Sequence, residues 1–114
     1  MSIVSLTKFN AKLAAPLRPS DTVMTLRITK TWLDALNSIA DGNTLYLMLD
    51  YYDRFEFVRF DKQGAIQASG GAIKLLVDRA QFGTSAQSWP TGNCVRYELT
   101  GEILSAVLTE QCKL

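Results

Sequence analysis

The feature that most limits the fold of this chain is a series of short segments in which apolar and polar residues alternate. Alternation with a period of two is typical of strands that bury one face, and turn residues separate each segment from the next. Several short strands joined by turns predict a small, mainly β domain, either a sandwich or a barrel. The expected strands cover residues 23–29, 44–51, 54–61, 72–79 and 93–99, with a weak one at 65–68.

One or two short helices are expected beside these strands. Thr31 is followed three residues later by Asp34, a spacing that resembles a capping box and predicts a helix from residue 31 to about residue 39. We expect Trp32 of this helix to lie in the core. Residues 100–108 fit a helix or a strand equally well, and residues 1–10 fit an arm or an edge strand. A chain of 114 residues is expected to form one domain, residues 1–114.

The segment of residues 77–95 is expected to be a strand that ends at a Gly-Thr turn, then a loop anchored by Trp89, then a turn into another strand. Arg79 lies at the end of the first strand. It could form a surface ion pair with Asp78, or it could turn inward and hold the loop. We favour the inward orientation, because one guanidinium can bond several backbone carbonyls at once.

The composition limits the chemistry that is available to the chain. Lys and Arg number 12 against 11 Asp and Glu, so there is no excess of positive charge to attract nucleic acid or an anionic membrane. Histidine is absent, which removes the usual general base and the commonest transition-metal ligand. The sequence therefore predicts no catalytic residue, metal ligand or cofactor, and an enzyme is the function class that it favours least.

Three local patterns are interpreted as structural. Ser69-Gly70-Gly71-Ala72 lacks the Lys and the following helix of a phosphate-binding loop, and is interpreted as a turn or a bulge. Asp50 and Asp53 flank a predicted hairpin turn and lack the spacing of an EF-hand calcium site. Aromatic and basic residues are interleaved over residues 51–60, as in oligonucleotide-binding sheets, but neighbouring acidic residues, among them Glu56, cancel the charge.

The ends of the chain and its two cysteines indicate no membrane or redox role. Residues 1–7 lack the basic start and apolar run of a signal peptide, and no apolar segment approaches the roughly 20 residues that span a bilayer. We therefore expect a soluble protein that is made in the cytoplasm. Cys94 and Cys112 form no metal-ligand or redox spacing. Two packed thiols are the favoured interpretation, and a disulfide between them is left open.

Three blocks of the chain, taken in order, resemble small β-domains of tailed-bacteriophage structural proteins. The most specific block is residues 77–95, which carry the pattern Arg-x3-Gly-Thr, then Trp-x2-Gly-x2-Val. The first block, residues 13–26, combines small residues with Asp-Thr-Val-Met-Thr-Leu. The second, residues 41–59, resembles a hairpin with an acidic residue in an aromatic strand. Together the blocks cover most of the chain.

The resemblance implies a structural role, because these domains are assembly and attachment modules of tails, baseplates and tail fibres. It implies that Arg79, Gly83, Thr84, Trp89 and Gly92 hold the long turn. The glycines permit positive φ, Thr84 can bond its own backbone, and the indole N–H of Trp89 can reach a carbonyl. The module often begins a longer fibre, whereas here it spans all 114 residues. We therefore expect an adaptor, a ring subunit or a decoration protein.

The expected function is that of a virion structural protein of the tail, baseplate or tail-fibre attachment, with other virion proteins and copies of itself as partners. A capsid decoration protein is the alternative. A small carbohydrate- or ligand-binding module, using Tyr51, Tyr52 and Trp89, is less favoured. The strand over residues 44–51 is apolar on both faces. Together with the proline-rich N-terminal segment of residues 14–21, it would supply intersubunit surface. The candidate interface residues are Leu45, Leu47, Leu49, Tyr51, Tyr52, Pro16 and Pro19.

Overall fold

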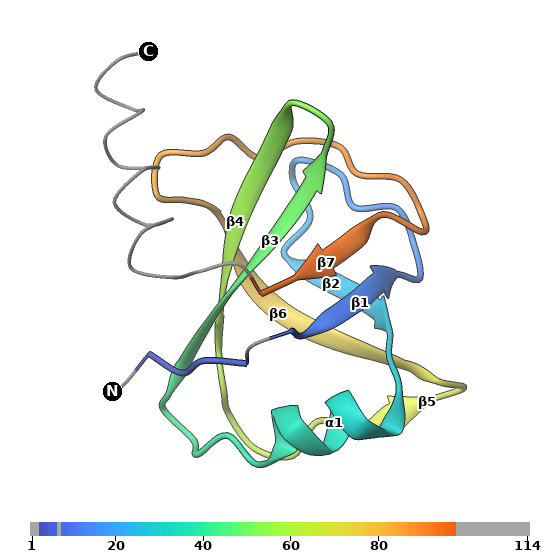
Figure 1. The fold of residues 1–114 in the computed structure, drawn as a ribbon, viewed down its shortest axis with the longest axis vertical. Coiled ribbons are helices and arrows are strands. Elements are labelled where there is room, and N and C mark those ends of the chain that lie inside the picture. The colour runs from blue at the N-terminus through green and yellow to red at the C-terminus, as the bar shows by residue number, and fades with distance from the viewer. Residues whose placement is uncertain (1–2, 7, 98–114) are drawn as a thin grey trace.

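The structure is a computed structural model that describes residues 3–6 and 8–97. Six antiparallel strands close into a barrel in the order β2, β1, β7, β3, β4, β6, and the pairing of β6 with β2 completes the ring (Figure 1). The mainly β fold is confirmed, and of the two expected architectures the chain adopts the barrel. The strands are β1 (Asn10–Leu13), β2 (Val23–Arg27), β3 (Thr44–Tyr51), β4 (Arg54–Asp61), β5 (Ala68–Ser69), β6 (Ala72–Gln81) and β7 (Cys94–Arg96).

The hairpin of β3 and β4 contributes much of the barrel interior. Its register pairs Leu45 with Phe60, Leu47 with Val58 and Leu49 with Glu56, so these six side chains share the inner face. The three leucines have no exposed surface at all. The structure therefore corrects their assignment to an interface.

The outer face of the same hairpin is also apolar, which is why the sequence alone could not show which face is the core. Tyr46 and Met48 pack there against Phe57, and Phe82 and Tyr97 join the same cluster. Coverage of both faces was expected for this strand. At least part of that cover comes from the chain itself rather than from a neighbouring subunit.

The single helix among the described residues, α1 (Lys30–Asn37), lies across one end of the barrel (Figure 1). Its N-cap is Thr29, whose hydroxyl accepts a hydrogen bond from the N–H of Trp32. The expected capping residue, Thr31, is therefore two residues too late, and the helix begins at Lys30. Leu36 is fully buried, and Trp32 is half-buried with its ring edge-on to Phe9 at 5.3 Å.

Of the arm or edge strand expected for residues 1–10, the described residues before Asn10 form no regular strand. Ile3 forms an isolated parallel bridge with Thr44, and the first strand is β1, which was not expected. At the other end only residues 94–96 of the expected strand at 93–99 form β7. Residues 98–99, the undecided segment 100–108 and Cys112 lie outside the described residues. Cys94 is exposed. None of the described helical residues forms a segment long and apolar enough to span a bilayer.

The two ends of the barrel are different. One end carries α1 and the turn between β5 and β6, where Gly70 and Gly71 both have positive φ. The other end, called the loop end below, gathers three connections: residues 14–22, the tip of the β3–β4 hairpin, and residues 82–93 (Figure 1). Most of the residues singled out in the sequence belong to the loop end.

Candidate interaction site at the loop end

A buried carboxylate lies beneath the loop end. Glu56 is on the inner face of β4, in line with Val58 and Phe60, and it is completely shielded from solvent. A carboxylate in such a position is strongly destabilising unless it is paired and its oxygens are hydrogen-bonded. The arrangement around Glu56 therefore determines how this end of the barrel is held.

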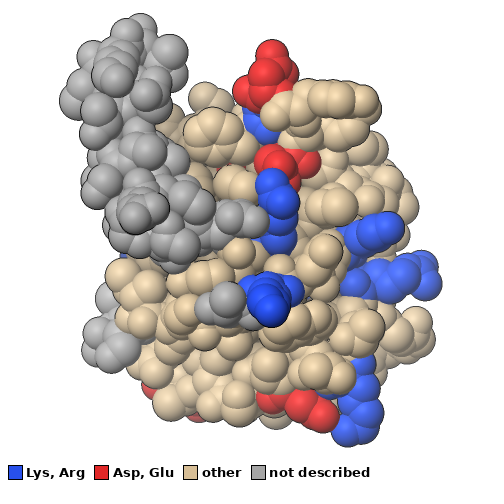
Figure 2. All heavy atoms as spheres, in the orientation of Figure 1, with Lys and Arg blue, Asp and Glu red and all other residues tan. Residues whose placement is uncertain are grey.

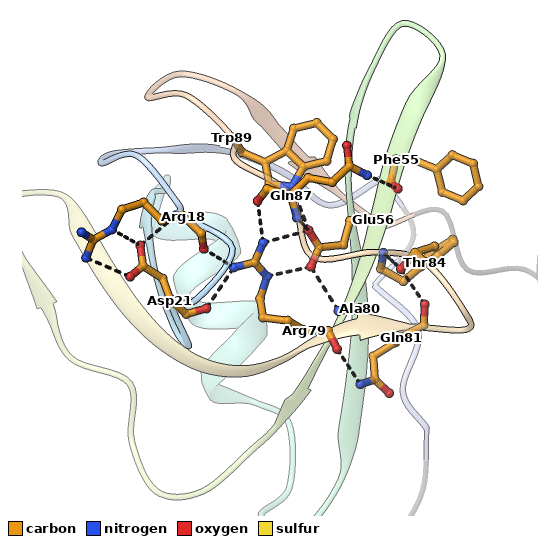
Figure 3. Close-up of polar contacts among 11 residues, drawn as sticks. Arg18, Asp21, Phe55, Glu56, Arg79, Ala80, Gln81, Thr84, Gln87 and Trp89 are labelled. Carbon is orange, nitrogen blue, oxygen red and sulfur yellow. Dashed lines mark hydrogen bonds and ion pairs between the residues drawn. The ribbon is translucent and has the colours of Figure 1, made fainter.

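Both oxygens of Glu56 are fully engaged, as Figure 3 shows. The guanidinium of Arg79 donates two parallel hydrogen bonds, from Nε to Oε2 at 2.6 Å and from Nη2 to Oε1 at 2.8 Å. Oε2 also accepts from the N–H of Ala80 at 3.1 Å. Oε1 accepts from the N–H of Gln87 at 3.0 Å and from the indole N–H of Trp89 at 2.9 Å. Five donors from two segments thus converge on one side chain.

Arg79 has the inward orientation that the sequence predicted. Its Nη1 donates to the carbonyl oxygens of Arg18 and Asp21 at 2.6 and 2.9 Å, and its Nη2 donates to that of Gln87 at 2.8 Å. With the two bonds to Glu56, all five N–H groups of the guanidinium are used. One side chain therefore fastens the two long connections of the loop end to β4. We call Glu56 and Arg79 the buried pair.

The sequence around Arg79 explains its position. Ile73, Leu75 and Val77 alternate into the core along β6, and continuation of that period places Arg79 on the inner face as well. Immediately afterwards Ala80 takes a positive φ of 55°, and the register between β4 and β6 shifts. This bulge shifts the pairing, which resumes between Phe57 and Gln81, and the connection that returns over the barrel begins after Gln81.

Trp89 anchors that connection. Its backbone exchanges two hydrogen bonds of 2.8 Å with Leu17, which ties residues 82–93 to residues 14–22. The ring is almost fully buried, and the guanidinium of Arg54 lies 4.5 Å from the ring centroid. The indole N–H was expected to reach a carbonyl, but it donates to the carboxylate of Glu56 instead. This corrects the expected partner and makes the bond a charge-assisted one.

The remaining residues of the predicted loop set lie in the same connection. The hydroxyl of Thr84 donates to the carbonyl of Gln81 at 2.7 Å, and it accepts from the N–H of Phe57 at 3.1 Å. Gly83 and Gly92 have positive φ angles of 76° and 88°. The structure therefore brings all five predicted loop residues into one end of the barrel.

Gly92→Ala is expected to lower the free energy of unfolding by roughly 1–2 kcal/mol, the usual cost of a left-handed conformation for a residue with a Cβ. Nothing lies within 4 Å of the added Cβ, so the loss comes from the backbone alone. Gly92→Asn, which tolerates positive φ better, should lose less. Urea denaturation measures both variants, and equal losses would contradict a conformational cause.

The buried pair makes stability depend on pH. Burial alone would raise the pKa of Glu56, but hydrogen bonds from Arg79, Trp89, Gln87 and Ala80 outweigh it and hold the pKa below its ordinary value of 4.5. The unfolded chain therefore binds the proton first as pH falls. The stability that ionised Glu56 contributes is complete above about pH 4.5 and is lost as pH falls through the lower pKa of the folded state.

The stability difference between the wild type and Glu56→Gln should therefore shrink as pH falls below 4.5. Urea denaturation between pH 7 and pH 3 measures this difference. A difference that stays constant over that range would show that Glu56 does not titrate at a lowered pKa.

The loop end exposes an aromatic tip above this braced interior. Tyr52 is 88% exposed and Tyr51 is 53% exposed, and their rings meet edge-to-face at 4.4 Å. Phe55 is exposed beside them. Pro16 and Pro19 are exposed on the neighbouring connection. These four predicted interface residues, Tyr51, Tyr52, Pro16 and Pro19, therefore lie on the surface of one end of the molecule.

The charged side chains near the loop end include an ion pair at the hairpin tip. Asp50 is bonded to Arg96 at 2.6 Å, so one of the two carboxylates that flank the hairpin tip is already paired. Across the described ranges, no three His, Cys, Asp or Glu side chains are grouped as metal ligands would be. On the face shown in Figure 2, uncharged residues cover most of the surface between the Lys and Arg side chains.

Sequence reasoning missed the role of Glu56, which was counted among surface charges. Its partners are 23 to 33 residues away in the chain, so no local pattern announces them. The signal that could have found Glu56 is its position in the alternation of β4. It shares a strand face with Val58 and Phe60, and Arg54 at the exposed start of the strand is the other charged residue on that face. The opposite face holds Phe55 and Phe57, which made the two faces look alike.

A scan against models of protein families finds no match to this chain, and a search of curated proteins finds no match either.

Proposed function

We propose that this protein is a non-enzymatic structural component of a bacteriophage virion, in the tail, baseplate or tail-fibre attachment, and that it acts by binding other virion proteins. The observation that carries the proposal is the loop end: an exposed aromatic tip on connections that are fastened by the buried pair. Tyrosine is enriched in protein interfaces, and a rigid display lowers the entropic cost of binding. The resemblance of residues 77–95 to phage modules supports the same function.

The test is whether the protein is incorporated into virions, and at which position. A tagged copy is expressed in the host during infection, and the purified virions are examined by immunogold labelling. Label at the tail or its tip is the expected result. Label over the capsid surface would favour the alternative, a decoration protein, and virions without label would overturn both assignments.

A pair of variants tests the loop end itself. Tyr51→Ser together with Tyr52→Asn removes the aromatic tip, and Asn suits the positive φ of 55° at residue 52. Because both rings are largely exposed, the monomer should stay folded. The variant should be excluded from virions at least about tenfold, as expected when interface aromatics are lost. Ile3→Ser, another exposed apolar residue away from this tip, should enter virions like the wild type.

A further inference from the structure

The outer face of β6 carries a second exposed patch, away from the aromatic tip. Alternation along β6 points Lys74, Leu76 and Asp78 outward. Leu76 is 69% exposed and is paired in register with Val23 of β2, which is 47% exposed. We call these four residues the β6 strip. An apolar centre with a charge of opposite sign on either side is a common composition for a protein contact.

The two charges of the strip are not held by direct bonds within the part of the chain that the structure describes, although Asp78 interacts electrostatically with Arg59. Neither Lys74 nor Asp78 makes a side-chain hydrogen bond or an ion pair there. The cation opposite Asp78 in the register is Arg59 of β4, and its Nε is bonded to Asp61 at 3.0 Å. Both charges therefore keep their hydrogen-bonding capacity for an incoming molecule.

The order of the side chains along β6 makes the strip complementary to the same strip on a second copy of the chain. Lys74 and Asp78 lie two positions to either side of Leu76, about 13 Å apart along the strand. A two-fold axis that crosses β6 at right angles at Leu76, in the plane of the contact, brings a second copy face to face and antiparallel. Leu76 then meets Leu76 of the partner subunit, and Lys74 meets Asp78 of the partner subunit. The same pair forms twice, as an isologous contact requires.

We propose that the β6 strip is a two-fold interface between copies of this chain. Charge complementarity selects the antiparallel arrangement, because a parallel one would place Lys74 opposite Lys74 and Asp78 opposite Asp78. Val23 widens the apolar centre on the β2 side. On the opposite side, the strip borders a hollow of about 890 Å³, lined also by Arg59, Gln63 and Gln67. This interface does not depend on the virion assignment and is separate from the loop end.

The experiment is sedimentation equilibrium of the full chain from micromolar to millimolar concentration. The wild type should show a monomer–dimer equilibrium that weakens as salt is added, because exposed charge pairs are screened. By symmetry, Lys74→Glu creates two like-charge contacts and should raise the dissociation constant at least about tenfold. Asp78→Lys should do the same.

The decisive variant combines the two changes. Lys74→Glu with Asp78→Lys exchanges the charges, restores both contacts and should return the dissociation constant to within about threefold of the wild type. Lys12→Glu on β1 makes the same change in net charge outside the strip and should leave dimerisation intact. All the changed residues are exposed, so the variants should fold.

Three results would overturn the proposal. The first is a wild type that is monomeric at every concentration. The second is a double variant that associates as weakly as the single ones. The third is Lys12→Glu weakening the dimer as much as Lys74→Glu, since the effect would then reflect net charge alone.

Discussion

Replacing Glu56 by Ala is expected to lower the free energy of unfolding by about 3–5 kcal/mol, because it leaves the guanidinium of Arg79 buried without its counter-ion. It also removes the acceptor of three further donors, from Ala80, Gln87 and Trp89. Arg79→Met should have a loss of similar size for the converse reason. Guanidinium chloride denaturation measures both losses.

The double variant Glu56→Leu, Arg79→Met tests whether the two charges stabilise only each other or whether Arg79 also holds the connections of the loop end in place. Apolar replacement of a buried pair is often neutral when the two charges serve only each other. Here Arg79 also bonds the carbonyls of Arg18, Asp21 and Gln87. The double variant should therefore remain destabilised, and recovery to wild-type stability would contradict this role.

A matched control is the pair of Asp50 and Arg96, which is as short, at 2.6 Å, but partly exposed. Asp50→Ala should lower the free energy of unfolding by no more than about 1 kcal/mol, as is usual for exposed pairs. If Asp50→Ala lowered the free energy of unfolding as much as Glu56→Ala, burial would not explain why the Glu56–Arg79 pair contributes so much to stability.

Trp89→Ala should lower the free energy of unfolding by about 3–5 kcal/mol, because it empties the space of a buried aromatic ring. It also removes the ring beneath Arg54 and the donor to Glu56. Chemical denaturation measures this loss. Unchanged stability with lost binding to a partner would mean that Trp89 is a contact residue and not an anchor.

Conservative replacements of tryptophan separate the contribution of the indole ring to stability from that of its N–H group. Trp89→Phe keeps most of the packing and loses the hydrogen bond to the carboxylate, which should cost about 1.5–3 kcal/mol. Trp32→Phe is the matched change at a half-buried indole that bonds no residue in the described part of the chain. The difference between the two losses measures the contribution of the charge-assisted bond.

The strands that sequence analysis predicted best are those with strict local signals. The bounds of β3 and β4 agree with the expected ones, because turn residues enclose both segments. The helix start was wrong because Thr29 and Thr31 both suit an N-cap, and packing of the helix on the barrel selects between them. β1 escaped notice because four residues with one buried leucine and one buried alanine give a weak pattern.

The loop end was predictable in part. The glycines, Thr84 and the direction of Arg79 follow from properties of single residues. The buried position of Glu56 does not, because it depends on which face of β4 closes the barrel. That choice is made by Leu45, Leu47 and Leu49, which were assigned to a surface although they fill the interior. An error about one face thus concealed both the core and its carboxylate.

The distance along the chain between Arg79 and the residues that it bonds has a consequence for how the chain folds. Arg79 is separated by 61 and 58 residues from Arg18 and Asp21, whose carbonyls it bonds. A chain that is still being synthesised and has not reached Arg79 would hold Glu56 in an apolar interior without any of its five hydrogen bonds. Closure of the barrel before that point is therefore disfavoured. We expect folding to proceed late and cooperatively, with the amides of residues 82–93 among the last to gain protection from hydrogen exchange.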